Sequence, residues 1–531
     1  MDTKVAIIGG GFSGIYALKY CIQEKLNCIL FEGMDSIGGR WKYNSERSSS
    51  IYKNTCSSSS LSFLHPVDYP FAENTPEFPN HKLIYKHLVD YVEHFDLEQY
   101  IKLSTYIEKV VKVEDKWHIY IIKEGKEIKE IFDKVIICTG IHQVPLIPQE
   151  KMYENFIDPN KIIHSHNFGI RREEIKDKKV LIIGGGEAAH DIACDLSPNN
   201  EKIYMSIRNG QWFQEKKEGE VLIDLLFNRF FKSVWCSPVA HIISYMKEYL
   251  WGRGGSSIKV WEPNTNYFNS FITKGREHLM WVAKGKIEPC GKVLKIDKNE
   301  ILFNDKTVEV DYIILCTGYQ NTHLVKLLPD INTDKRNYKL IFNQNDTSLS
   351  YCGFARPIIT SLSSISELQA RLISKVYSDV VSLPSKEEMI KDKEQYNINI
   401  NNERLNYLIN PYIYSDEIAD LIGCRPNLNK LFFTDHILWR QLFFYPWSHF
   451  HYTINSKDEK VRRISRENLC KLQKSITGKR LKGFTVFLLT LIILTILLLI
   501  AALIGIIFGF VKAKPYITQA FYVLLFLLIP I

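Results

Sequence analysis

The sequence predicts an α/β fold with two parallel sheets, each carrying a glycine-rich loop between a strand and a helix. Residues 9–14 read GGGFSG, and they follow the apolar run 5–8 and precede residues 15–23, which are spaced like a helix. A second loop, residues 184–189, follows the apolar run 180–183. Short apolar runs that end in glycine are typical of buried parallel strands. Two such units predict two doubly wound domains.

The first loop has the spacing G-x-G-x-x-G, which is typical of a dinucleotide site. The pyrophosphate of a dinucleotide lies against backbone N–H groups at a helix N-terminus, so side chains must be absent there. Glu32 follows the apolar run 27–31, where a carboxylate accepts hydrogen bonds from ribose hydroxyls. The alternative, a glycine-rich turn beside a solvated Glu32, is less favoured because the pattern occurs twice. The candidate residues are Gly9, Gly10, Gly11, Phe12, Ser13, Gly14 and Glu32.

The second loop has the related spacing G-x-G-x-x-A and precedes a predicted helix over residues 191–196. The predicted strand 202–207 ends in Arg208 rather than in an acid. A guanidinium binds a ribose 2′-phosphate, which a carboxylate repels. The first site therefore suits FAD and the second NADPH, although Arg208 as an ordinary surface arginine remains an alternative. The candidate residues are Gly184, Gly186, Ala188, Ala189, Asp191 and Arg208.

Two more apolar runs, residues 135–140 and 312–319, end in Thr-Gly and in Thr-Gly-Tyr and predict strands that close the two units. The predicted organisation is a Rossmann-like FAD domain split by an inserted NADP domain. Its first part covers residues 1–155, the insert 156–325 with a helical aromatic insertion, and the returning part 326–475. Most aromatic residues between 212 and 281 are expected to be core, with a substrate channel wall or a membrane contact as alternatives.

Composition narrows the class of protein. The 531 residues, 46% hydrophobic and 24% charged, predict a globular chain of two or three domains and exclude a disordered one. The 11 cysteines are dispersed without a C-x-x-C pair or a metal-like grouping. This predicts reduced thiols and no metal, and it argues against flavin disulfide reductases, which need a redox dithiol. The net charge of +8 gathers partly at residues 462–482.

The last segment, residues 476–531, is expected to be a basic linker followed by a membrane anchor. Residues 483–511 contain no charge, and about 20 apolar residues suffice to cross a bilayer as a helix. A basic cluster beside such a run favours anionic lipid over nucleic acid. It also orients the globular body toward the cytosol, in an endoplasmic-reticulum-like membrane. Because a second apolar run follows at residues 516–531, three arrangements remain as alternatives: one membrane span, a hairpin of two apolar segments, or an interfacial anchor.

Nearly the whole chain resembles the flavin-containing monooxygenases. The resemblance begins in the segment 37–41, which in that family leads from the ribose acid to the flavin, so Arg40 and Trp41 are candidate FAD contacts. Residues 164–168 match the family's His-x-x-x-Phe/Tyr, and Cys316 to Tyr319 are similar to its Ala-Thr-Gly-Tyr. Residues 365–371 are similar to its Ser-Glu-Leu-Gln-x-Arg, which makes Gln369 a further FAD candidate. The pattern over residues 416–428 occurs in animal members.

Three features depart from the family pattern. Phe156 is too far from His164 for the first half of the family's fingerprint and lacks the glycine between them, and Glu187-Ala188 stands where the family often has Asn-Ser. The third departure is in the flavin loop. The family's flavin loop carries an asparagine that positions the cofactors and the oxygen adduct, and Ser58 stands at the corresponding position of this chain. A hydroxyl still donates one hydrogen bond but is shorter than an amide. Ser58 is therefore the candidate catalytic residue, and efficient coupling of NADPH use to oxygenation depends on it.

The resemblance implies a monooxygenase of the N,N-dimethylaniline type. FAD reduced by NADPH takes up O2 as a C4a hydroperoxide, and this oxygenates a soft small-molecule nucleophile, an amine nitrogen or a sulfide sulfur. An NADPH oxidase that releases hydrogen peroxide and a Baeyer-Villiger enzyme acting on ketones are alternatives, although Phe168 argues against the second. A membrane-anchored flavoprotein acting as a sensor or scaffold is the non-enzymatic alternative.

Overall fold

The computed structural model describes residues 3–44, 51–123, 126–148, 151–218, 221–226, 228–229, 258–264, 270, 272–331, 337–392 and 407–477. The chain divides into two compact units. The first comprises residues 1–215 and 251–424, and the second comprises residues 216–250 and 425–531. The predicted domain boundaries at 155, 325 and 475 stay predictions. Both phosphate loops lie in the first unit.

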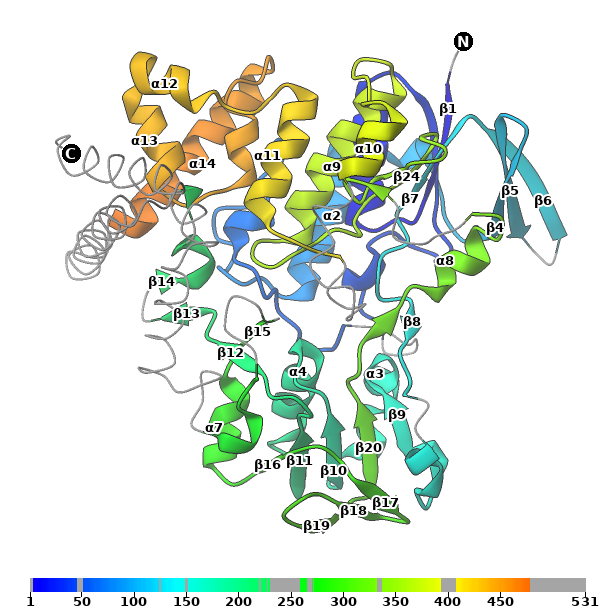
Figure 1. Cartoon of the computed structure of the whole chain (residues 1–531), viewed down its shortest axis with the longest axis vertical. Coiled ribbons are helices and arrows are strands. Elements are labelled where there is room, and N and C mark those ends of the chain that lie inside the picture. The colour runs from blue at the N-terminus through cyan, green and yellow to red at the C-terminus, as the bar shows by residue number, and fades with distance from the viewer. Residues whose placement is uncertain are drawn as a thin grey trace, which may run out of the picture. The chain divides into compact units, whose positions relative to one another are not determined.

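A seven-stranded sheet carries the first phosphate loop (Figure 1). Strand β1 pairs in parallel with β2 on one side and with β7 on the other, while β22, β23 and β24 extend the sheet beyond β7. The predicted strand 27–31 is found with the same bounds. In spatial order the strands are β22 (Asn337–Tyr338), β23 (Phe342–Asn343), β24 (Leu349–Tyr351), β7 (Lys134–Ile137), β1 (Lys4–Ile8), β2 (Asn27–Phe31) and β3 (Ile101–Lys102).

Helix α1 (Phe12–Gln23) follows the first phosphate loop and packs against α9 (Leu362–Tyr377). Buried polar side chains join the two helices. The Tyr16 and Ser363 hydroxyls lie 3.0 Å apart, and Tyr20 donates a hydrogen bond of 2.8 Å to Glu367. Helix α9, which lies in the later part of the first unit, is therefore bonded directly to the helix that follows the first phosphate loop.

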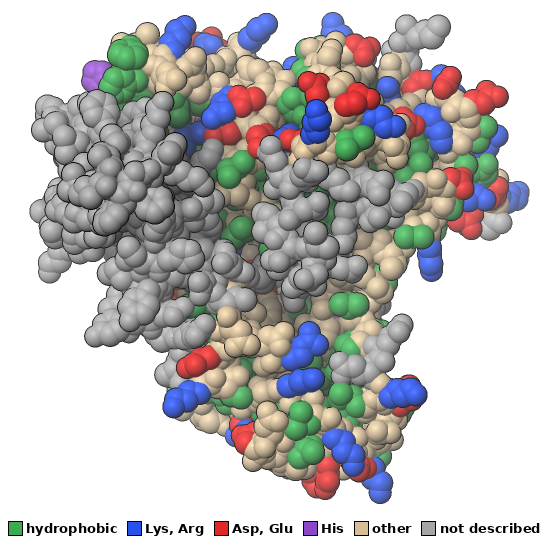
Figure 2. All heavy atoms as spheres, in the orientation of Figure 1, with side chains coloured by type: hydrophobic (Ala, Val, Ile, Leu, Met, Phe, Trp, Pro, Cys, Tyr) green, Lys and Arg blue, Asp and Glu red, His purple; other side chains and the backbone are tan. Residues whose placement is uncertain are grey.

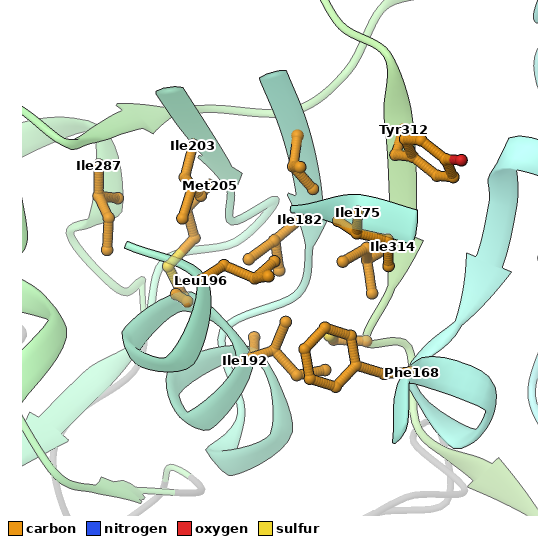
Figure 3. Packing of buried hydrophobic residues seen from close by; sticks show 14 of the residues in the cluster. Phe168, Ile175, Ile182, Ile192, Leu196, Ile203, Met205, Ile287, Tyr312 and Ile314 are labelled. Carbon is orange, nitrogen blue, oxygen red and sulfur yellow. The ribbon is translucent and has the colours of Figure 1, made fainter. Parts of the chain in front are cut away.

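A five-stranded parallel sheet carries the second phosphate loop, with α4 (Glu187–Leu196) and α7 (Glu277–Ala283) packed beside it (Figure 1). Figure 3 shows Ile192 and Leu196 of α4 pointing toward the strand residues Ile182 and Met205. Tyr52, which lies far earlier in the chain, belongs to the same buried core. In spatial order the strands are β16 (Ile287–Cys290), β11 (Lys202–Ser206), β10 (Lys179–Ile183), β20 (Tyr312–Leu315) and β9 (Ile162–His164).

Smaller elements complete the first unit. The seven-stranded sheet is mixed, since β23 pairs antiparallel with β22 and β24. Two antiparallel three-stranded sheets accompany the two large sheets, and two-stranded pairs link distant segments. These strands are β4 (Tyr106–Val113), β5 (Lys116–Lys123), β6 (Lys126–Phe132), β17 (Lys295–Asp297), β18 (Glu300–Leu302), β19 (Thr307–Glu309), β8 (Val144–Pro145) with β21 (Tyr319–Gln320), β12 (Trp212–Gln214) with β15 (Ile272–Lys274), and β25 (Arg356–Pro357) with β26 (Leu408–Ile409). The remaining helices are α2 (His81–His94), α3 (Phe168–Ile175), α8 (Thr322–Leu327), α10 (Lys386–Asp392) and α11 (Pro411–Ile422).

The second unit is mainly helical where it is described. It contains α12 (Leu428–Thr434), α13 (His436–Phe444) and α14 (Glu459–Thr477), together with the short strands β13 (Lys217–Glu218) and β14 (Val221–Leu222). Its core includes Trp447, whose indole N–H donates to the Tyr452 hydroxyl at 3.1 Å. Asn228 donates to the Phe444 carbonyl at 2.9 Å, so residues near 228 pack with this unit.

The predicted membrane segment 483–511 and most of the predicted aromatic insertion lie outside the described residues. Among the residues that are described, none of the helices combines the length and the apolar character that crossing a bilayer requires. On the face shown in Figure 2, basic and acidic side chains are interspersed over the described surface.

Burial of His87 predicts a loss of stability in acid. Its ring stacks on Phe71 with centroids 3.5 Å apart, and this burial lowers the pKa of His87 to about 3. The unfolded chain binds this proton below a pH of about 6.5, whereas the folded chain does not until about pH 3. His87 therefore reduces the stability of the folded state as the pH falls through this range.

We expect His87→Phe to make unfolding less dependent on pH. Between about pH 6 and pH 4, the slope of the unfolding free energy should fall by about 1.4 kcal/mol per pH unit, the effect of one proton. Denaturant titrations at several pH values measure this slope. A slope equal to that of the unsubstituted protein would contradict the neutral, buried state of His87.

Candidate functional site

Steric constraint explains the glycines of the first phosphate loop. Gly9 has φ +113°, and a Cβ atom there would lie 2.6 Å from the Cys138 carbonyl oxygen. A Cβ atom on Gly14 would lie 1.8 Å from the Gly9 carbonyl oxygen. Helix α1 then begins after Gly11 without a side-chain cap. The glycines let the loop pack closely against the backbone, and no side chain caps the N–H groups of the first turn, which leaves them available to a pyrophosphate.

Glu32 lies at the end of β2 and is only 9% exposed. One carboxylate oxygen accepts from the Gly10 N–H at 2.6 Å, and the other accepts from the Met34 N–H at 2.8 Å. Burial raises the pKa of Glu32, and these backbone hydrogen bonds oppose the rise. The carboxylate is thus held against the phosphate loop, with lone pairs left to accept from ribose hydroxyls.

The segment after Glu32 folds back onto the loop. The Gly38 N–H donates to the Gly10 carbonyl at 2.9 Å. Arg40 is exposed, with its guanidinium carbon 5.9 Å from the Trp41 ring and Nη1 3.5 Å from Nδ1 of His142. The structure thus brings both predicted contacts to the rim of the first phosphate loop.

The second phosphate loop repeats the geometry of the first. Gly184 donates to the Ser206 carbonyl at 2.9 Å, just as Gly9 donates to the Phe31 carbonyl at 2.8 Å. A Cβ atom on Gly184, which has φ +134°, would lie 2.4 Å from the Cys316 carbonyl oxygen. Helix α4 begins after Gly186, again without a side-chain cap. The second loop therefore also excludes side chains and leaves a helix N-terminus open.

The remaining candidates of the second site differ in exposure. Ala189 is fully buried against the sheet, whereas Ala188 and Asp191 are half-buried. Arg208 is exposed in the turn after β11, where Ile207 occupies the position that Glu32 has in the first site. A solvent-facing guanidinium at this position is available to an anionic group.

Ser58 lies at the apex of a tight turn in the serine loop, residues 57–60. Ser57 forms this turn, since its hydroxyl donates to the Ser59 carbonyl at 2.7 Å and accepts from the Ser59 N–H at 3.1 Å. The Ser59 hydroxyl in turn donates to the Thr360 carbonyl at 2.9 Å, just before α9. Ser58 itself is half-buried. Its neighbours thus fix the turn and leave its side chain at the edge of solvent.

Gln369, a predicted FAD contact, lies close to the first phosphate loop. It is completely buried, with its amide oxygen accepting from the Gly353 N–H at 2.9 Å and its amide nitrogen donating to the Tyr414 hydroxyl at 2.6 Å. Gly353 in turn lies so close to Ser13 that a Cβ atom on it would be 2.0 Å from the Ser13 hydroxyl. Gln369 thus positions the backbone beside the first phosphate loop, and its direct contact with FAD stays a prediction.

Sequence reasoning missed two residues of the second site. The Thr273 hydroxyl donates to the Gly185 carbonyl at 2.7 Å, 88 residues away, and Lys274 reaches Ser59. They come from the short strand β15, and no motif marks them. Tyr319 belongs to a quoted motif but was not assigned to the site; its ring contacts those of His142, His164 and His166.

Both loops fit a dinucleotide, because each has glycines at which a Cβ atom would clash with the backbone and a helix start without a side-chain cap. The fold and the two sites define a two-nucleotide oxidoreductase of the α/β class. Residues 2–509 match the family model Flavin-binding monooxygenase-like, and the chain belongs to that family. The predicted family, flavin cofactor and flavin-dependent monooxygenase activity are thereby confirmed.

Relatives agree with this membership. Flavin-containing monooxygenase 5 of Oryctolagus cuniculus and Dimethylaniline monooxygenase (N-oxide-forming) 2 of Cavia porcellus are each 28% identical to the chain, over 86% of this chain and 89% of their own length. The structure of S-allyl-L-cysteine S-oxygenase from Allium sativum covers 88% of this chain and 98% of its own, with a TM-score of 0.60 and 22% identity. This last likeness supports the fold.

Proposed function

We propose that the protein uses NADPH and O2 to oxygenate a soft nucleophile, an amine nitrogen or a sulfide sulfur, with FAD at the first phosphate loop. The observation that carries the proposal is the pair of matching loops in one unit, one followed by Glu32 and the other by Arg208. The names of relatives that form N-oxides or oxygenate sulfur support this substrate class.

When bound, the flavin supplies the redox chemistry, accepting a hydride and activating oxygen. The chain supplies binding and orientation. Glu32 would accept from the ribose of FAD, and the start of α1 would hold its pyrophosphate. The start of α4 would hold the pyrophosphate of NADPH, and Arg208 would bind its 2′-phosphate. Ser58, at the apex of the serine loop, would offer one hydroxyl donor near the reacting atoms.

The test measures reduction of the flavin by NADPH first and formation of the oxygenated product second. We expect NADPH added without oxygen to bleach the visible flavin absorbance of the purified protein. We then expect O2 with a tertiary amine or a thioether to give the N-oxide or the sulfoxide. Unbleached flavin would reject the use of NADPH and favour a sensor or scaffold. Bleaching followed by peroxide in place of oxygenated product would reject the monooxygenase assignment.

A second candidate, an NADPH oxidase that releases hydrogen peroxide, is favoured by one observation. Ser58 is half-buried, and a short hydroxyl at this position shields the site from water less than a longer amide does. The two candidates differ in how much of the NADPH consumed yields peroxide. A Baeyer-Villiger enzyme is less favoured, because Phe168 matches the family's pattern and is buried against Tyr52.

We expect Ser58→Asn to raise the fraction of NADPH that is coupled to oxygenated product by about two- to tenfold. An amide reaches further and offers two donors instead of one. Oxygen uptake, product and peroxide are measured together for the variant and the unsubstituted protein. The matched control is Ser385→Asn, at an exposed position before α10 and outside both cofactor loops. An unchanged yield of peroxide in Ser58→Asn would remove this residue from the mechanism.

We further propose that the segment 476–531 anchors the protein to an endoplasmic-reticulum-like membrane, with the body in the cytosol. The uncharged run 483–511 and the preceding basic residues support this proposal. Membrane fractions that still contain the protein after removal of residues 483–531 would contradict it. The division into an FAD domain, 1–155 with 326–475, and an NADP insert, 156–325, is likewise proposed, supported by the strands that each sheet contains.

A further inference from the structure

Lys274 lies between the two cofactor loops. It is the last residue of β15, and its ammonium nitrogen is 3.4 Å from the Ser59 hydroxyl of the serine loop. The preceding residue, Thr273, donates to the Gly185 carbonyl in the second phosphate loop at 2.7 Å. Two consecutive residues thus contact both loops. A ligand that reached from the second loop toward the serine loop would come close to this pair of residues.

The ammonium group of Lys274 is poorly compensated. The residue is half-buried, and its contact with Ser59 is long for a hydrogen bond, although an ammonium group has three protons to donate. Considering only the described part of the chain, Lys274 has no carboxylate within ion-pair distance. Removing a charge from water without a partner is costly. The position therefore favours an anionic ligand.

The backbone of Lys274 is fixed to the second site. Strand β15 pairs in parallel with β12, with Lys274 opposite Gln214. The next residue, Gly275, has φ +130° and lies so close to α4 that a Cβ atom there would be 2.6 Å from Nε2 of His190. His190 is held in turn by the ring of His278, with their Nδ1 atoms 2.8 Å apart. The backbone next to Lys274 thus packs directly against α4, the helix that begins at the second phosphate loop.

We propose that Lys274 binds a pyrophosphate oxygen of the pyridine nucleotide where the coenzyme leaves the second phosphate loop. This inference rests on the proposed function. It assigns Lys274 a different part of the coenzyme from Arg208, which lies after β11 and is assigned to the 2′-phosphate. Loss of Lys274 therefore affects NADP+ and NAD+ alike, because both carry the pyrophosphate.

The test is equilibrium binding of NADP+ and of NAD+ to the FAD-loaded protein, measured by calorimetry. We expect Lys274→Met to weaken both ligands by the same factor, about tenfold or more, and Lys274→Arg to stay within about threefold of the unsubstituted protein. The matched control is Lys295→Met, an exposed lysine of β17 outside both sites. An unchanged flavin spectrum in each variant verifies that the fold and the first site are intact.

Three results would overturn the inference. Undiminished binding of both ligands by Lys274→Met would reject the role of Lys274 but leave the proposed function standing. Weakening confined to NADP+ would also leave the proposed function standing, but it would assign Lys274 to the 2′-phosphate instead of the pyrophosphate. Failure of the unsubstituted protein to bind either ligand would reject the proposed function together with the inference.

Discussion

The Gly14→Ala variant is expected to purify without flavin. A Cβ atom at this position would lie 1.8 Å from the Gly9 carbonyl oxygen, far inside van der Waals contact. Because that oxygen belongs to the phosphate loop itself, relief of the clash requires the loop to move away from α1. We expect at least about a tenfold loss of FAD affinity, the equivalent of about 1.4 kcal/mol. The flavin-to-protein absorbance ratio after gel filtration measures it.

The matched control for this variant is Gly169→Ala in α3. A Cβ atom there would meet only the ring of Tyr43, at an ordinary contact distance of 3.8 Å. Alanine also has a better helix propensity than glycine. We therefore expect Gly169→Ala to keep its flavin and its melting temperature. A flavin content of Gly14→Ala equal to that of the control would show that the first phosphate loop is not the flavin site.

The Arg208→Ala variant is expected to lose discrimination between NADPH and NADH. The guanidinium is exposed in the turn after β11, where a 2′-phosphate would form charge-assisted hydrogen bonds with it. Loss of these bonds should weaken NADPH relative to NADH by about 1 to 3 kcal/mol. Rates of anaerobic flavin reduction at several concentrations of each coenzyme give the two apparent affinities.

Arg208→Lys serves as the conservative variant in this experiment. A lysine keeps the charge but offers no planar, bidentate donor pair, so it should restore only part of the preference for NADPH. Equal losses for both coenzymes in Arg208→Ala would reject the assignment of Arg208 to the 2′-phosphate. They would leave the second phosphate loop as the nucleotide site.

The parts of the site that the sequence predicts are those built by neighbouring residues. Glu32 directly follows a predicted strand, and the parallel pairing of β1 with β2 brings it to Gly10. The same logic predicts Gly184 and the start of α4, because strand, loop and helix are continuous in the chain. The helices begin earlier than predicted, at Phe12 and at Glu187, because the last glycine of each loop is already helical or caps the helix.

Residues that act across long separations in sequence could not be predicted in this way. The burial of Gln369 depends on Tyr414, and the place of Lys274 depends on the pairing of two three-residue strands. Neither strand is long enough to show a hydrophobic period. The antiparallel sheet of β4, β5 and β6 was also not predicted, because no sequence motif marks its strands. In each case tertiary contacts decide the position of the side chain.

The burial of Tyr52 has a consequence for protein engineering. Its ring belongs to the buried core beside the five-stranded sheet and lies 5.4 Å from that of Phe168, while Asn54 donates to Asp195 of α4 at 2.8 Å. Removal of residues 156–325 would expose the Tyr52 ring, because its packing partners lie in that segment. Transfer of the same segment to another protein would leave a cavity at the position of the ring. Chimeras with relatives should therefore exchange residues 51–55 together with residues 156–325.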